Sequence, residues 1–331
     1  MRIRNNKLLY FYFGQWVFFF IFFFASTSKA IYLTDNEALL FIFGGFIILG
    51  FLEPIILVLL IQRLKKQTSK KFSQKYASEL QELVLPAIRL KPQNLTRDNI
   101  QISKYGGFPN ITSLNQWPKN REGKYLDFIG QIYFQHLNQE IKQKFPIELP
   151  KEGVLLFFLD VNSLFTKTEI NPNQDYQIVY TKETVEKVAY EKPLQYLSIK
   201  LTQLVPELFD SYPSYDDEVY NPKKILHKKV TPDAYFDLCL KDYHQLLGHP
   251  ATVQHDPRCD ILHNEIQVVK TDEDRSNLHR LFKNWRLLWQ IVSDPKIGLN
   301  LGGLGTIYMM IEQDRLVRYD FSNVRIVFQI T

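Results

Sequence analysis

The amino-acid sequence predicts an α+β domain, built mainly from antiparallel β-strands and preceded by two transmembrane helices. Three observations lead to this prediction. The first 61 of the 331 residues contain almost all the long apolar runs. Later segments alternate polar and apolar residues, as strands with one buried face do, and only two later stretches have helical spacing. We therefore expect a membrane anchor at residues 1–61, a basic juxtamembrane linker or helix at 62–84 and a folded domain at 85–331.

The two apolar segments at the N-terminus are predicted to span a membrane. Residues 8–24 reach the lower limit of about 17 for a crossing helix, and residues 38–61 exceed it with one ionisable side chain, Glu53. A cleaved signal peptide is the alternative for the first segment, because basic residues precede it and small residues follow. Six basic residues between positions 63 and 75 predict a cytoplasmic C-terminal domain. We therefore expect a multi-pass protein of the inner (plasma) membrane, with bilayer lipid as a partner.

The folded domain is expected to contain more strands than helices. A short helix is predicted at residues 76–91, ending before Pro92, and two further helices at 234–247 and around Leu278 to Trp285. The closely spaced Gly302, Gly303 and Gly305 predict a turn with positive φ. The remaining apolar or alternating runs predict strands at 128–134, 154–159, 197–201, 288–292, 307–311 and 324–330.

Composition and motifs exclude several classes of function. The net charge is only +5, and the one dense basic run follows an apolar segment, so no nucleic-acid partner is expected. Cys239 and Cys259 are read as free thiols. The chain has no phosphate-binding glycine loop, nucleophile elbow or paired-cysteine metal motif. We therefore expect no cofactor and no metal, and enzymatic activity is not favoured.

One stretch gathers most of the polar residues that could form a site. His244, His249 and His255 lie close to Asp256, a combination that could supply a general base or metal ligands. The first two histidines are five residues apart rather than four, and glycine and proline interrupt any helix between them. The alternative is therefore that these residues bond the backbone of a loop. The candidate ligand or partner site comprises His244, His249, His255, Asp256, Arg258 and Asp294.

Four segments in order resemble one known family. They are SKYGGFPNI at 103–111, HQLLGHPATVQHDPR at 244–258, LLWQIVSD at 287–294 and YDFSNVRIVFQ at 319–329. Together they resemble the YwqG-like family of uncharacterised bacterial proteins, over roughly residues 85–330. The resemblance implies a compact β-rich domain with roll-like sheets and no established reaction, in a family whose members are suspected of being immunity proteins. The chain departs from the family pattern at Leu301 to Gly303, where relatives tend to have Trp-Gly-Asp.

Two functions of different classes follow from the sequence. The first is a membrane-anchored, cytoplasm-facing domain that binds a protein partner, such as a toxin against which it gives immunity. The alternative is a membrane-tethered hydrolase or metal enzyme that uses the region of His244, His249 and His255. The binding function is favoured because no set of nucleophile, base and orienting group can be assembled from the sequence.

Overall fold

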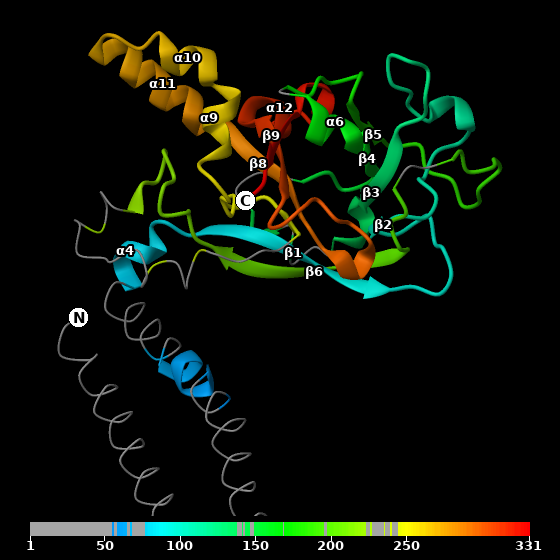
Figure 1. The fold of residues 1–331 in the computed structure, drawn as a ribbon, viewed down its shortest axis with the longest axis horizontal. Helices are drawn as coiled ribbons and strands as arrows, with labels where there is room; N and C mark the ends of the chain where they lie inside the picture. The colour runs from blue at the N-terminus through cyan, green and yellow to red at the C-terminus, as the bar shows by residue number, and fades with distance from the viewer. Residues whose placement is uncertain are drawn as a thin grey trace, which may run out of the picture. The chain divides into compact units, whose positions relative to one another are not determined.

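The computed structural model describes residues 55, 58–64, 67, 77–137, 141, 143–145, 149–167, 169–194, 197–222, 226, 235, 239 and 244–331. The chain divides into two compact units, residues 1–71 and 72–331, and most of the described residues belong to the second (Figure 1). The domain boundary at residue 85 stays a prediction. The elements of the second unit are α4 (Ala77–Gln81), β1 (Leu85–Asn94), β2 (Lys104–Tyr105), η2 (Leu114–Gln116), β3 (Asp127–Tyr133), η3 (Phe134–His136), β4 (Val154–Leu159), α6 (Val161–Thr166), β5 (Tyr176–Thr181), β6 (Thr202–Ser211), β7 (Gln245–Leu246), α9 (Pro257–Ile261), α10 (His263–Gln267), α11 (Asp272–Asn284), β8 (Trp285–Val292), η4 (Pro295–Ile297), β9 (Thr306–Glu312), α12 (Gln313–Val317), η5 (Phe321–Asn323) and β10 (Arg325–Gln329).

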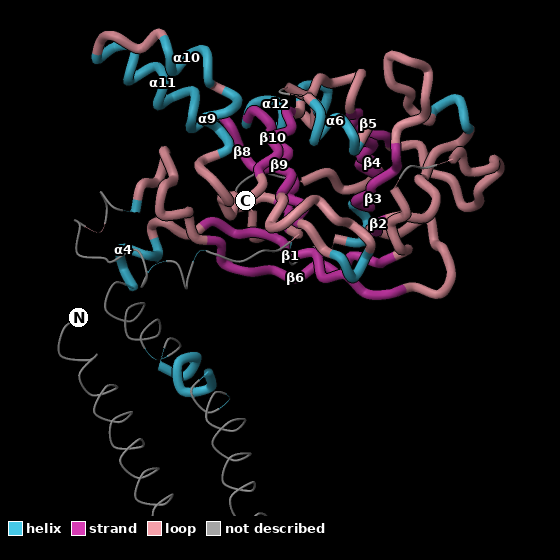
Figure 2. The backbone as a smooth tube through the Cα atoms, viewed as in Figure 1, coloured by secondary structure: helices cyan, strands magenta, loops and turns pink. Residues whose placement is uncertain are grey.

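The described strands form one antiparallel sheet of ten strands in the order β10-β9-β8-β7-β1-β6-β2-β3-β4-β5. The prediction of a mainly antiparallel sheet is therefore confirmed. At the middle of this order, β1 and β6 pair along their full length, from Leu85 opposite Ser211 to Asn94 opposite Thr202. Figure 2 shows these two long strands running along one side of the domain, with the shorter strands rising from them.

The sheet curls until its two end strands, β5 and β10, approach each other. The Tyr176 hydroxyl of β5 donates a hydrogen bond of 2.9 Å to the Val324 carbonyl just before β10. Nearby, the rings of Tyr180 and Phe321 lie 5.1 Å apart. The main core fills the inside of the curl with side chains from both halves of the sheet, including Phe157 and Trp289. The described residues show no hydrogen-bonded ladder between β5 and β10, so the curl is not closed by backbone pairing.

Several helices cover the outside of the β8–β10 end of the sheet. Leu262 of the α9–α10 junction and Phe282 of α11 pack against Tyr308 and Val327 in a second cluster of buried apolar residues. Helix α11 begins at Thr271, whose side chain and that of Asp274 form a reciprocal capping box. Figure 1 shows α9, α10 and α11 together beside β8, at the end of the domain away from β2 and β3.

Secondary structure differs from the sequence predictions in three places. The helix predicted at 76–91 is wrong beyond Gln81, because residues from Leu85 form β1 and bury Ile88 and Leu90 on one face. The strand predicted at 197–201 is absent, and β6 starts at Thr202. Within the helix predicted at 234–247, only residues 235, 239 and 244–247 are described; the first two are helical, but Gln245–Leu246 forms β7.

The prediction of two transmembrane helices, and with it that of a multi-pass inner-membrane protein, is corrected. Among the described residues, no helix is both long enough and apolar enough to cross a membrane. Helix α11, with 13 residues, is the longest helix whose bounds the structure gives, whereas a crossing helix needs about 20 residues. The predicted segment 8–24 lies outside the described residues, as does 38–61 apart from residues 55 and 58–61.

Candidate functional site

The structure separates the six predicted site residues into three places. His249, Asp256 and Arg258 lie together in a buried group of charges with Asp217, which the sequence analysis did not single out. His244 and Asp294 lie elsewhere, beside Tyr105, and His255 lies at the surface. Among the described residues, no three His, Cys, Asp or Glu side chains are placed to hold a metal ion. The six residues therefore do not form one site.

The buried charge cluster, Asp217, His249, Asp256 and Arg258, is organised by its arginine. Arg258 donates from Nη2 to Asp217 Oδ2 at 2.7 Å and from Nε to Asp256 Oδ1 at 2.8 Å, and at most 4% of each of these side chains is exposed. The Asp256 carboxylate also caps α9 by accepting from the Arg258 backbone N–H. His249 Nε2 donates to the Leu83 carbonyl at 2.8 Å, which assigns its proton.

The ionisation of this cluster follows from its pairing. Burial opposes the charge on Asp217, but Arg258 and His249 outweigh burial and hold the pKa of Asp217 well below its usual value. Burial likewise opposes the charge on Arg258, and the two carboxylates raise its pKa above the usual value. All four side chains are buried; Arg258 bonds both carboxylates, and His249 bonds the Leu83 carbonyl. The cluster therefore joins the segments around Leu83, Asp217 and Arg258 and offers no group to a substrate.

A second polar group, Tyr105, His244 and Asp294, connects strands from both halves of the sheet. The Tyr105 hydroxyl lies 3.0 Å from His244 Nδ1, and His244 Nε2 lies 3.8 Å from Asp294 Oδ2, too far for a hydrogen bond. Burial raises the pKa of Tyr105 well above 10 and lowers that of His244, and the neighbouring imidazole lowers that of Asp294. Tyr105 has no exposed surface, so this group cannot deliver a nucleophile to a ligand from solvent.

His255, the third predicted histidine, lies at the edge of a large surface hollow. Its Nε2 is 2.9 Å from Asp260 Oδ1, and both side chains are more than a third exposed. Asp260 also accepts a hydrogen bond of 3.1 Å from Gln329 Nε2 at the end of β10. This pair therefore ties the start of the α9–α11 region to the end strand and leaves Asp260 on the wall of the hollow.

This hollow, here named the seam hollow, lies where the two ends of the curled sheet approach. Its volume is about 570 Å³, within the range of about 300–1,000 Å³ that is usual for ligand sites. It is lined by residues 164, 167, 169–171, 176, 260–265, 281, 285, 312 and 325–328. Sequence reasoning missed this site because its walls come from five separated segments, none of which carries a motif.

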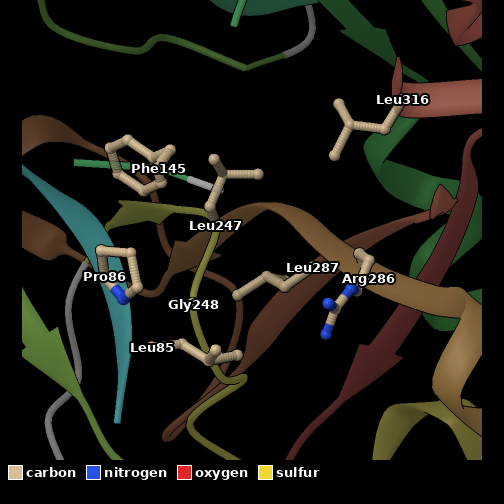
Figure 3. Close-up of a pocket in the computed structure, with 8 residues that line it drawn as sticks. All are labelled: Leu85, Pro86, Phe145, Leu247, Gly248, Arg286, Leu287 and Leu316. Atoms are coloured by element: carbon tan, nitrogen blue, oxygen red, sulfur yellow. The ribbon is translucent and has the colours of Figure 1, made fainter. Parts of the chain in front are cut away.

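Two further concavities have less to offer a ligand. A polar hollow of about 630 Å³ lies between the turn at residues 120–125 and α6, and its buried carboxylate, Asp175, is already bonded to Lys167 and Ser163. A depression of about 40 Å³ near Gly248 and Leu316 has room for very few water molecules, and Figure 3 shows mainly aliphatic side chains around it.

Comparison with known proteins gives the family but no function. No curated protein matches the chain. A family model described as Domain of unknown function (DUF1963) matches residues 103–329, which is more than half of the chain. The match covers β2 to β10 and therefore the seam hollow, the buried charge cluster and the Tyr105 group. The chain belongs to the DUF1963 family.

Proposed function

We propose that this domain is a binding module that takes a protein partner at the seam hollow. The proposal rests on a contrast between the buried polar side chains, which are bonded within the protein, and the carboxylates at the seam hollow, which are exposed. The side chains with the greatest potential for chemistry are buried and already bonded within the protein: Arg258 to Asp217, and His249 to the Leu83 carbonyl. The open hollow of about 570 Å³ instead presents exposed carboxylates, among them Glu169 and Glu265, which suit recognition of a charged surface.

The resemblance to the YwqG-like proteins supports a finer form of this proposal, in which the partner is a bacterial toxin and the domain gives immunity by binding it. The alternative function, a hydrolase or metal enzyme built on His244, His249 and His255, has less support. These histidines lie in three different places, and two of them are almost completely buried.

A photo-crosslinking amino acid at two matched glutamate positions tests the proposal. Position 265 lines the seam hollow, and position 273 is exposed on α11 outside it. We expect the full-length chain, expressed in its own cells, to crosslink to one defined polypeptide from position 265 and not from position 273.

The purified partner should then bind the unmodified chain, with affinity about tenfold weaker after Glu265→Lys and unchanged after Glu273→Lys, which corresponds to about 1.4 kcal/mol. The same adducts from both positions, or affinity that ignores Glu265→Lys, would show that the hollow is not the binding surface.

A further inference from the structure

Strand β10 contributes its edge to the seam hollow. Arg325, Ile326, Val327 and Phe328 all line the hollow. Successive side chains of a strand point to opposite faces of the sheet, and here Ile326 belongs to the main core while Val327 packs in the outer cluster beneath α11. A hollow that touches four consecutive residues therefore runs along the edge of the strand and not over one face.

No described strand pairs with that edge, although the Tyr176 hydroxyl of β5 reaches its start, where it donates to the Val324 carbonyl at 2.9 Å and accepts from the Ile326 backbone N–H. β10 pairs with β9 from Arg325 opposite Met310 to Gln329 opposite Thr306, and with no other described strand. In an antiparallel pair, the N–H and C=O groups of alternate residues point away from the partner strand. Free edges of this kind are templates for another strand, and many domains bind extended peptides by this route.

The walls of the hollow favour a basic occupant. Four carboxylates line it, those of Glu169, Asp260, Glu265 and Glu312, against Arg325 and Lys167, and Lys167 is paired with Asp175. Asp260 is shared with His255, and Glu312 with Arg315. The remaining two, Glu169 and Glu265, are exposed and have no partner within the described part of the chain.

Apolar groups lie between these charges. Leu281 of α11, which is 38% exposed, and the strand residue Phe328 both line the hollow. An added strand would therefore meet carboxylates and apolar surface in turn, which suits a segment that alternates basic and aliphatic residues.

We infer that the seam hollow binds an extended segment of a partner protein, with Lys or Arg at alternate positions, as an additional strand on the edge of β10 that no described strand pairs with, displacing the Tyr176 hydroxyl from that edge. The inference rests on the proposed binding function and specifies its mode. The five residues of β10 span about 17 Å at roughly 3.4 Å per residue, so five or six residues of the partner suffice to cover the edge.

Short synthetic peptides test the mode of binding on the full-length chain. The probe is a fluorescent hexapeptide, Lys-Val-Lys-Val-Lys-Val, with blocked ends, and binding is followed by fluorescence anisotropy. One analogue carries N-methyl groups on the three lysine amides, a second carries them on the three valine amides, and a third replaces lysine by glutamate. A strand bonds its neighbour through alternate residues, so only one of the two methylated peptides should lose binding, by at least about tenfold.

The charge requirement is tested with the same peptides. The glutamate peptide should bind at least about tenfold more weakly than the lysine peptide. The double variant Glu169→Lys with Glu265→Lys should bind the lysine peptide more weakly than the native chain does, by a similar factor. Glu273→Lys should leave the affinity for the lysine peptide unchanged. Hydrogen exchange in residues 325–329 should slow when the lysine peptide is bound.

Three results would overturn the inference: equal binding of both methylated peptides, absence of binding by the lysine peptide, or slowed exchange in β10 that grows with protein concentration alone. The last would mean that a second copy of the chain occupies the edge. These outcomes are separate from the crosslinking result. A partner that crosslinks at position 265 but does not slow hydrogen exchange in β10 would refute binding as an added strand, while the proposed binding at the seam hollow would still stand.

Discussion

Replacing Arg258 by methionine should strongly destabilise the domain, because it removes a positive charge that contacts both carboxylates of the buried cluster. Methionine retains much of the side-chain volume, so the main loss is electrostatic. Two charge-assisted hydrogen bonds disappear, to Asp217 at 2.7 Å and to Asp256 at 2.8 Å, and both carboxylates stay buried. Breaking such a buried pair costs about 3–5 kcal/mol.

Partial compensation places the expected loss in the lower half of that range. Asp217 keeps the hydrogen bonds from the backbone N–H groups of Val219 and Tyr220, which continue to stabilise its charge. We therefore expect about 3–4 kcal/mol at pH 7. For a unit of this size, that loss lowers the Tm by roughly 6–16 °C.

The pH dependence provides a sharper test than the size of the effect. In the native chain the pKa of Asp217 is depressed, so its contribution is present above the unfolded value near 3.8 and is lost as pH falls through the folded value. Without Arg258, burial and the neighbouring Asp256 should instead raise the pKa of Asp217, and the variant then gains stability as pH falls. The difference between native chain and variant should therefore shrink between pH 7 and pH 4.

Thermal unfolding followed by circular dichroism, from pH 7 to pH 4, measures both quantities. Arg275→Met is the matched control, because Arg275 pairs with Asp272 on α11 with both side chains mostly exposed, and such a pair contributes little. A loss for Arg258→Met no larger than that of the control, or a loss that is the same at every pH, would refute this account of the cluster.

Four further predictions follow from the same structure. His244→Gln should reduce the fall in stability between pH 7 and pH 5, because burial lowers the pKa of native His244 and the unfolded state therefore takes up its proton first as pH falls below about 6.5. Burial also lowers the pKa of His136, so some dependence of stability on pH should remain in the variant. The same dependence in variant and native chain would contradict this role of His244. Gly248→Ala should cost about 2–4 kcal/mol in urea unfolding, because φ is +75° and the added Cβ would lie 2.6 Å from the Ala87 Cβ, so a neutral result would contradict the packing. A fragment of residues 76–331 should unfold cooperatively on heating, because the four apolar clusters are built from residues of this fragment; a molten or aggregated product would count against it. Elemental analysis of purified protein should find no stoichiometric zinc or iron, and metal that is lost on replacing His249 and His255 would revive the enzyme hypothesis.

The sequence predicted those strands whose local pattern already matched their environment. Residues 154–159 are apolar without interruption, and β4 occupies these positions with all six residues buried. The predicted glycine turn has positive φ at Gly302, +73°, and at Gly303, +36°, but not at Gly305. In both cases the information lies within a few neighbouring residues, so tertiary contacts had little to override.

β1 could not be predicted in this way, because its two prolines argue against a strand and interrupt the pattern of alternating apolar and polar residues. Pro86 and Pro92 lie within the strand, yet β7 pairs with β1 only at Ile88 and Arg89. The prolines therefore lie where that side of β1 has no described partner, and proline is tolerated at such positions. Only the arrangement of the neighbouring strands shows this, and a single sequence does not contain it.

The sequence identified several residues of the two buried polar groups, but not how these residues are arranged in space. Tyr105 and His244 lie 139 residues apart in the chain and meet only because the sheet curls. Asp217, which completes the buried charge cluster, lies in a loop without a recognisable signal. The walls of the seam hollow are harder still, because Glu169, Glu265 and Arg325 become neighbours only when the two ends of the sheet approach.

The curl itself links the buried polar residues to the proposed binding edge. Register shifts that accompany β-bulges occur in β3 between Phe128 and Gly130 and in β8 between Leu287 and Trp289, and bulges increase strand twist. Trp289 then stacks on Tyr105 at 6.0 Å, although three strands separate β8 from β2 in the sheet.

Such contacts across the interior belong to the core that holds together the two halves of the sheet, whose end strands, β5 and β10, both border the seam hollow. A substitution in this buried group can alter binding at β10 without touching the ligand, provided that it changes the curl. Under the proposed binding mode, the segments around Tyr105 and His244 then control the geometry of the edge, while exposed residues such as Glu169 and Glu265 select the partner.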